Sequence, residues 1–255
     1  MKPIRCFDKE SLTVRIYDSR ALMGQAAALD GAALLRDLLA RQQTVRAVFA
    51  AAPSQNEFLQ ALCAQPEIDW ARVTAFHMDE YIGLDRAAPQ GFGNFLRQRV
   101  FDCLPFGQVH YLDGNAADPR RECQRYAALL KQAPIDMVFM GIGENGHIAF
   151  NDPPVARFDD PALVKVVALD EVCRNQQVHD GCFSHIEQVP THALTLTVPA
   201  LAGARHHLCM VPASTKARAV HDTIEGPVST ACPASILRTC PSAVLYLDRD
   251  SAALL

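Results

Sequence analysis

The chain lacks the features that mark membrane, secreted and nucleic-acid-binding proteins. No stretch of its 255 residues approaches the roughly 20 apolar residues that a membrane span needs. Its first residues, MKPIRCFDKES, contain no apolar run, so we expect no secretory signal. A formal net charge of −4 gives no broad cationic surface for nucleic acid or acidic membranes. We therefore expect a cytoplasmic protein that binds a small molecule, with no nucleic acid and no membrane partner.

Close pairs of cysteines are also absent. The chain has nine cysteines, but none forms the CxxC pair that is usual in zinc sites. A protein framed by disulfides would be shorter and secreted. Most of the nine have apolar neighbours, as Cys63 and Cys209 do. We predict reduced, mostly buried thiols, no metal site and no organic cofactor.

Repeats, low-complexity stretches and Gly/Ser linkers are missing as well, so nothing marks a domain boundary. Short apolar runs alternate instead with segments of helical periodicity. Strands are expected at 45–52, 73–78, 136–140, 164–169, 193–198, 207–211 and 243–247, and helices at 19–41, 56–65, 94–100, 120–131 and 215–224. This alternation is typical of a parallel sheet covered on both faces. We predict a single α/β domain over residues 1–255, doubly wound and Rossmann-like, with a mostly parallel sheet flanked by helices.

Polar residues directly follow four of the predicted strands. In an open parallel sheet, ligands bind beyond the carboxyl ends of the strands, so these residues should meet at one rim. They are Ser54, Gln55 and Asn56 after the first strand, Asp79 after the second, Gly141–Pro153 after the third, and Lys216 after the strand at 207–211. The convergence predicts one binding site at that rim.

The glycines of Gly141–Pro153 permit sharp turns and a close approach of backbone to ligand. We therefore expect Gly143 and Gly146 beside the substrate. The spacing fits GxGxxG, but the apolar residues that follow lead to Asn-Asp-Pro-Pro and not to a long helix. A dinucleotide site is not expected in that context.

The same segment holds a single histidine, His147, with Asn145 and Asp152 nearby. A carboxylate beside a histidine orients the ring and favours its protonated form. That arrangement suits proton transfer between the oxygens of a sugar or alcohol. The alternative is a histidine that only ties the loop together by hydrogen bonds.

Asp79 and Glu80 are adjacent acids at the end of an apolar strand. Alternation along a strand aims them in opposite directions, so one of them should face the pocket. A carboxylate there acts as a general base when burial raises its pKa; the alternative is a helix cap or a surface pair. Lys216 starts a predicted helix, where its ammonium and free backbone N–H groups form a small anion site. The alternative is an exposed lysine.

Two strings, Phe76–Leu84 (FHMDEYIGL) and Gly141–Pro153 (GIGENGHIAFNDP), resemble the glucosamine-6-phosphate deaminase/isomerase family, relatives of the 6-phosphogluconolactonases. Val189–Leu196 (VPTHALTL) and the string Ser-Thr-Lys-Ala that contains Lys216 match as well, in the family's order. The Asp-Glu-Tyr and Gly-His-Ile-Ala-Phe-Asn strings favour the deaminase branch over the lactonases.

The resemblance implies conversion of an amino-sugar phosphate, glucosamine 6-phosphate above all, to fructose 6-phosphate and ammonia without a cofactor. It assigns to His147 the opening of the sugar ring and to Asp79 the transfer of the C2 proton to C1. Asn145 and Asp152 take the places of acids that support the histidine. The alternatives are a sugar-lactone hydrolase and a non-catalytic sugar-phosphate-binding protein. The resemblance is compatible with a homo-oligomer as well as with a monomer.

The chain departs from the family pattern at the residues that bind phosphate in the family. A Gly-rich loop is replaced by the stretch that holds Pro53, Ser54, Gln55 and Asn56, where Pro53 removes one backbone donor. A phosphate-binding arginine is replaced most simply by Gln177, with Arg174 as a substitute from a shifted position. With Lys216, these residues are the predicted substrate contacts.

Overall fold

The computed structural model describes residues 1–255 and contains two β-sheets. The larger has eight strands in the order β1-β2-β11-β10-β7-β3-β4-β6. In that order they span Arg5–Lys9, Leu12–Tyr17, Ala243–Asp248, His206–Val211, Met137–Met140, Val45–Phe49, Val73–His77 and Gln108–His110. All neighbours pair in parallel except β1 with β2. The predicted fold class is confirmed.

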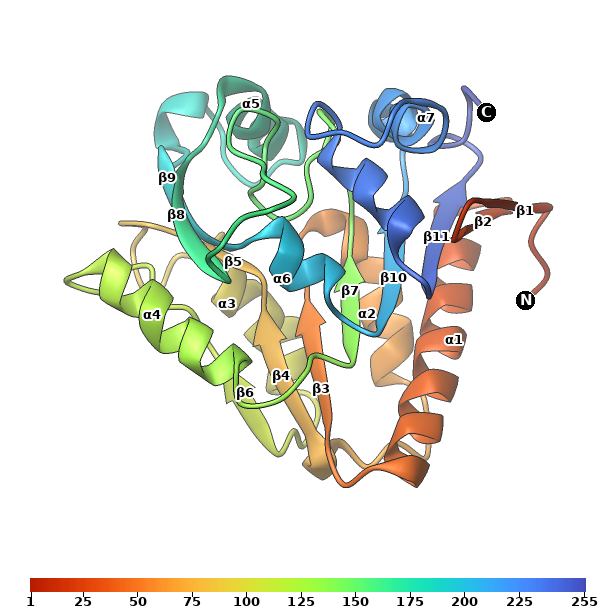
Figure 1. Cartoon of the computed structure of the whole chain (residues 1–255), viewed down its shortest axis with the longest axis horizontal. Coiled ribbons are helices and arrows are strands. Elements are labelled where there is room, and N and C mark those ends of the chain that lie inside the picture. Colours follow the sequence, from red (N-terminus) through yellow and green to blue (C-terminus); the bar gives the residue numbers. More distant parts are fainter.

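Seven α-helices accompany the sheets. They are α1 (Arg20–Arg41), α2 (Asn56–Cys63), α3 (Phe92–Leu96), α4 (Pro119–Leu130), α5 (Glu171–His179), α6 (Val198–Ala202) and α7 (Ala217–Glu225). The arrowheads of β3, β4 and β7 point to the side of the molecule where α5 and α7 lie (Figure 1). The carboxyl ends of these strands therefore open toward a rim that helices flank. No helix combines the length and the apolar character that crossing a membrane requires.

Each central strand contributes to two separate cores, which explains its near-continuous apolar sequence. Val45, Ala47 and Phe49 of β3 belong to one hydrophobic cluster. Val48, between them, belongs to the other. Because successive side chains of a strand point to opposite faces, both faces of the sheet are covered, as a doubly wound fold requires.

Two predicted strands lie outside the parallel sheet, which corrects the sequence-based interpretation. β8 (Val164–Ala168) and β9 (His192–Leu196) pair antiparallel with each other, and β5 (Asp79–Tyr81) pairs antiparallel with β9. Only Val164 and Val167 of the five residues of β8 are buried, so this strand is more solvated than the central strands. The small sheet brings β5, directly after β4, to the rim.

Other differences concern short or edge elements. The sequence analysis missed β1, β2, β5 and β6 and the helices α5 and α6. The predicted helix at 94–100 is α3 followed by a π-helical turn at Arg97–Phe101. β6, with three residues, and α6, with five, are too short to show periodicity, but this reason does not apply to the interior strand β2 or to the nine-residue helix α5. All nine cysteines are unpaired and five are buried, as predicted.

Candidate active site

One pocket collects residues from the ends of β3, β4, β7 and β10 and from α5. Seven of the predicted site residues line it: Ser54, Gln55, Asp79, Gly143, His147, Gln177 and Lys216. Met78, Phe92, Phe150 and Gln176 line it as well and were not predicted as site residues. The predicted convergence of strand ends is confirmed.

Asp79 is the carboxylate at this pocket. It is the first residue of β5 and is 6% exposed. Burial, with a smaller contribution from the charge of Glu80, raises the pKa of Asp79 well above its usual range. Glu80 points away, as strand alternation predicts, and accepts backbone N–H groups of Phe92 (3.1 Å) and Gly93 (2.8 Å). Asp79 is therefore the acid of the pair that can meet a ligand.

A buried imidazole holds the backbone of Asp79 in place. The Nε2 atom of His77 accepts the N–H of Leu112 at 2.9 Å, so the ring proton sits on Nδ1 and is donated to the Asp79 carbonyl at 2.8 Å. Burial lowers the pKa of His77 to about 4, which keeps the ring neutral. The sequence analysis missed this role, because nothing in the sequence around Asp79 shows that the His77 ring hydrogen-bonds to the backbone two residues further on.

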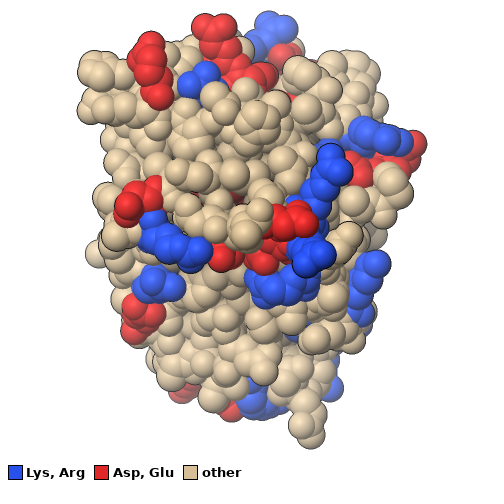
Figure 2. Space-filling model, turned by 90° about the vertical axis from the view of Figure 1, so that its left-hand side faces the viewer, with Lys and Arg blue, Asp and Glu red and all other residues tan.

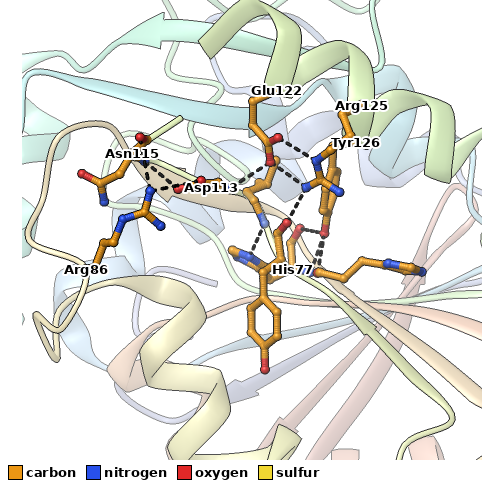
Figure 3. A network of polar contacts seen from close by, with 10 residues as sticks. His77, Arg86, Asp113, Asn115, Glu122, Arg125 and Tyr126 are labelled. Atoms are coloured by element: carbon orange, nitrogen blue, oxygen red, sulfur yellow. Dashed lines mark hydrogen bonds and ion pairs between the residues drawn. The ribbon is translucent and has the colours of Figure 1, made fainter. Parts of the chain in front are cut away.

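The network extends from His77 to α4 (Figure 3). The hydroxyl of Tyr126 accepts the N–H of His77 at 3.0 Å and donates to its carbonyl at 2.9 Å. One turn earlier, Glu122 is 6% exposed and pairs with Arg125 at 2.6 Å. It also accepts the N–H of Asp113 at 2.8 Å. These contacts fix the end of β4 and hence the start of β5.

His147 faces the pocket from the other side. Its Nδ1 atom lies 2.8 Å from Oδ1 of Asn145 and 2.8 Å from Oδ1 of Asp152. Both neighbours are acceptors, so Nδ1 carries a proton and Nε2 remains for the ligand. Asn145 also donates to Asp152 at 3.0 Å. Asn145 and Asp152 do not line the pocket and act through the ring.

Burial of Asp152 opposes its charge, but the hydrogen bond and charge of His147 outweigh this and lower its pKa. Asp152 is 1% exposed and stays ionised beside the ring. Asp170, the N-cap of α5, accepts the Asn145 amide at 3.3 Å. The sequence analysis missed Asp170, which lies 25 residues along the chain from Asn145.

Gly143 and Gly146 shape the histidine loop in different ways. The N–H of Gly143 donates to the carbonyl of His147 at 2.9 Å, and a side chain on Gly143 would collide with the imidazole. Gly146 has φ +81°, a conformation that favours glycine. It lies against Cys232 and does not line the pocket. The loop thus needs both glycines, although of the two only Gly143 lines the pocket.

Lys216 is the one lysine or arginine that lines the pocket. It is 4% exposed, and its Nζ has no hydrogen-bond partner. Burial lowers the pKa of Lys216, while the charges of Asp180 and Glu144 act in the opposite direction. An unpartnered buried ammonium that faces a pocket is a site for an anionic group.

Amide side chains also line this pocket. Gln55 donates to the carbonyl of Met210 at 3.2 Å, and its Oε1 is unpartnered. Gln177 is 7% exposed and lines the same pocket, at the position where the family resemblance implies an arginine. Lys216 is therefore the one permanent cation among the lining side chains. On the face drawn in Figure 2, acidic and basic side chains are interspersed and leave wide uncharged areas.

Besides Gly146, two more predicted substrate contacts lie outside the pocket, which corrects their placement. Asn56 begins α2, and its Oδ1 accepts Nε of Arg99 at 2.9 Å. Arg174 donates to the carbonyls of Ile186 (2.7 Å) and Val189 (3.0 Å). Neither side chain lines the pocket. The carbonyls of the loop after α5 thus hold the Arg174 guanidinium, and it does not substitute for a phosphate-binding arginine from a shifted position.

Comparison with known proteins gives consistent matches. The family model described as glucosamine-6-phosphate isomerases/6-phosphogluconolactonase matches residues 18–245. A glucosamine-6-phosphate deaminase of Exiguobacterium sibiricum is 38% identical over 188 residues, which are 74% of this chain and 73% of the relative. One of Bacillus thuringiensis is 36% identical over 188 residues, 74% of this chain and 70% of the relative.

Solved structures agree with these matches. The structure of a monomeric glucosamine-6-phosphate deaminase superposes with a TM-score of 0.87 at 26% identity and covers 95% of this chain and 99% of its own. A 6-phosphogluconolactonase from Thermotoga maritima has a TM-score of 0.75 at 18% identity, with 93% and 99% covered. At that identity the second likeness concerns the fold alone.

Proposed function

The chain belongs to the glucosamine-6-phosphate isomerase and 6-phosphogluconolactonase family, and from this premise we propose that it is a deaminase that converts glucosamine 6-phosphate and water to fructose 6-phosphate and ammonia. The observation that carries the proposal is the meeting of a buried carboxylate, Asp79, and an oriented imidazole, His147, in one pocket. A proton acceptor for a C–H bond and one for O–H bonds are what an aldose–ketose isomerisation needs.

In the proposed reaction, Nε2 of His147 takes the proton of the anomeric hydroxyl and returns it to the ring oxygen, which opens the sugar. The proton on Nδ1, shared with Asn145 and Asp152, keeps the ring in the tautomer that leaves Nε2 free. Ionised Asp152 stabilises the imidazolium that forms on the way. Asn145 and Asp152 are thus positioning residues for the proton transfer.

Asp79 then takes the proton from C2 of the open sugar and delivers it to C1. The raised pKa of Asp79 supports this role, because a more basic carboxylate is a better acceptor for a carbon-bound proton. The product of this step is the imine of fructose 6-phosphate. Water adds to its C2 and ammonia leaves, so the atoms balance without an oxidant or a reductant.

The phosphate is proposed to bind beside Lys216, with Ser54, Gln55 and Gln177 as uncharged donors. One ammonium and several amides give a weaker field than a site with an added arginine. We therefore expect phosphate to contribute less to affinity here than in a site that contains arginine.

We further propose that residues 1–255 work as one unit, as a monomer in the cytoplasm. The structurally similar deaminase is described as monomeric. Nine unpaired thiols favour a reducing compartment. Light scattering on the purified protein checks the mass, and a dimer would contradict the monomer.

The test is incubation of the protein with glucosamine 6-phosphate, with separate assays for ammonia and fructose 6-phosphate. Equal amounts of both products are expected. Absence of turnover with this substrate and with galactosamine 6-phosphate would reject the proposal. Hydrolysis of 6-phosphogluconolactone without ammonia release would assign the pocket to a lactonase instead.

Asp79→Asn and Glu80→Gln form a matched pair for the mechanism. Both remove an acid of β5, Asp79 being buried and Glu80 half-buried, but only Asp79 lines the pocket. Asp79→Asn is expected to lower kcat by about 10² to 10⁴, the usual contribution of a general base. Glu80→Gln should retain turnover. Loss of activity in both to the same degree would show that the acids support the fold and not the chemistry.

A further inference from the structure

A buried thiol lies behind the imidazole of the site. Cys173, on α5, is fully buried, and its sulfur has no place in the reaction proposed above. Its Sγ, a ring nitrogen of His147 and a carboxylate oxygen of Asp152 all lie within 4.8 Å of one another. The three residues are far apart in sequence, and the packing of α5 against the histidine loop brings them together.

The carboxylate of this trio has an unused ligand atom. Oδ2 of Asp152 meets no N–H or O–H donor, and the residue is 1% exposed. Oδ1 alone serves His147 and Asn145. The remaining donor beside this carboxylate is the thiol of Cys173. A thiol is a weak donor, so a cation satisfies the buried carboxylate better.

Charge around the thiol also favours a cation. Burial first, then the charges of Asp152 and Asp170, a hydrogen bond from the thiol to Asp152 and the charge of Asp79 disfavour the thiolate of Cys173 and raise its pKa. A bound divalent cation reverses this effect, because it offsets the neighbouring carboxylates and stabilises the thiolate directly.

We propose that His147, Asp152 and Cys173 form an inhibitory site for a soft divalent cation, zinc above all. Nitrogen, oxygen and sulfur together are the donor set of zinc. Bonds of about 2.0 to 2.3 Å in a tetrahedral site place donor atoms roughly 3.3 to 3.8 Å apart. Small side-chain adjustments bring the trio to that spacing, and a fourth position is left for water or for the amide oxygen of Asn145.

Metal binding changes the protonation of Cys173 and of His147. Cys173 releases its thiol proton to solvent, and the proton of His147 moves from Nδ1 to Nε2 by exchange with water. The ring can then no longer accept a proton from a ligand in the pocket, and Asp152 no longer supports it. Zinc should therefore stop the turnover proposed above, and this inhibition rests on the proposed function, whereas metal binding does not.

The binding test is a titration of the metal-free protein with Co²⁺, whose thiolate complexes absorb in the near ultraviolet. One equivalent and a thiolate-to-cobalt band are expected for the wild type. Cys173→Ser should lose the band, and Asp152→Asn should weaken binding by at least about tenfold. Cys209→Ser is the matched control, because Cys209 is equally buried but lies in β10.

A band that persists in Cys173→Ser would overturn the proposal. So would a band that disappears in the double variant Cys63→Ser/Cys103→Ser, two thiols that share a surface pocket. A thermal melt of each variant verifies the fold, and Cys173→Ala replaces the serine variant where a buried hydroxyl is not tolerated.

The inhibition test measures ammonia release with added zinc and then with EDTA. Wild type should be inhibited and then recover, and Cys173→Ser should resist zinc when compared with its own zinc-free rate. Equal inhibition of both would contradict the site. If glucosamine 6-phosphate is not a substrate, the cobalt titration still decides whether the metal binds.

Discussion

The buried carboxylate of Asp79 lowers the stability of the folded state, and the same burial suits it to the proposed reaction. Its carboxylate is buried, and burial raises its pKa well above the usual range. Below about pH 3.9 the group is neutral in both the folded and the unfolded state and costs nothing. As the pH rises through the raised pKa of the folded state, the charged form costs stability. The wild type should thus lose stability from Asp79 as the pH increases.

Asp79→Asn is therefore expected to raise the melting temperature near neutral pH while it lowers kcat. The amide keeps the shape of the side chain and removes the buried charge. Each kcal/mol gained shifts Tm by about 2 to 4 °C in a chain of this size. Melts of both proteins across the pH range are the measurement, with a difference that vanishes in acid. A variant that is less stable at every pH would contradict the argument.

His77 supports Asp79 through the backbone, so its loss should affect catalysis as well as stability. His77→Phe leaves the carbonyl of Asp79 and the N–H of Leu112 unpaired, at about 1 to 3 kcal/mol for each buried group. Because the backbone at Asp79 is then free to shift, kcat should fall more than the substrate affinity.

His207→Phe is the control for His77→Phe. His207 is 1% exposed and contacts the carbonyl of Leu201 at 2.9 Å, far in sequence from the pocket residues of β5. It should lower Tm without lowering kcat. Equal kcat values for the two variants, measured at a temperature at which both are folded, would remove His77 as a positioning residue.

The loop between β7 and β8 places the imidazole, and it does so through its backbone. Gly143 hydrogen-bonds to the carbonyl of His147, and the ring lies where a side chain of residue 143 would be. Gly141, two residues earlier, leaves room that is bounded by the flexible amide of Gln55 at 3.0 Å. The loop therefore tolerates a methyl group at residue 141 better than at residue 143.

Gly143→Ala should displace the His147 ring and lower kcat by about 10²-fold or more, since misplacement by an ångström has effects of that size. Gly141→Ala should cause a smaller loss, because the Gln55 amide can move. Steady-state kinetics of both variants are compared at equal folded fractions. A larger loss in Gly141→Ala would show that the amide end of the pocket, and not the ring position, limits the reaction.

The molecule as a whole is acidic, so its only attraction for an anion is local. Net charge is −4, and Lys216 is the sole lysine or arginine of the pocket. Burial lowers the pKa of Lys216, so its charged form is disfavoured in the folded state. The cost is full at a pH below the lowered pKa, falls as the pH rises above it, and disappears only above the ordinary lysine pKa of 10.5.

Lys216→Met is thus expected to raise Tm at neutral pH and to raise KM for the sugar phosphate by at least about tenfold, the effect of one lost charge-assisted contact. Inorganic phosphate should stabilise the wild type against heat and leave the variant unchanged. Thermal melts with and without phosphate measure both effects. Stabilisation of the variant by phosphate to the same degree would place the anion elsewhere.

The strands that were predicted correctly are those buried on both faces. Val45–Phe49 and Met137–Met140 are continuous apolar runs, which a sequence reveals without any neighbour. β8 and β9 were recognised as strands but assigned to the wrong sheet, because pairing is a long-range property. β6 is a three-residue edge strand whose periodicity is too short to identify.

The sequence by itself determined that Asp79, His147 and Lys216 reach one rim, because parallel strands end on the same side of a sheet, and the family resemblance added Gln177. Only the tertiary structure decided that His77 supports Asp79, that Arg174 binds a loop, and that Cys173 lies beside the imidazole. Chain order fixes which strand ends carry polar residues. The direction of a side chain, and the neighbour it meets, depend on the packing of helices such as α5, which no local pattern encodes.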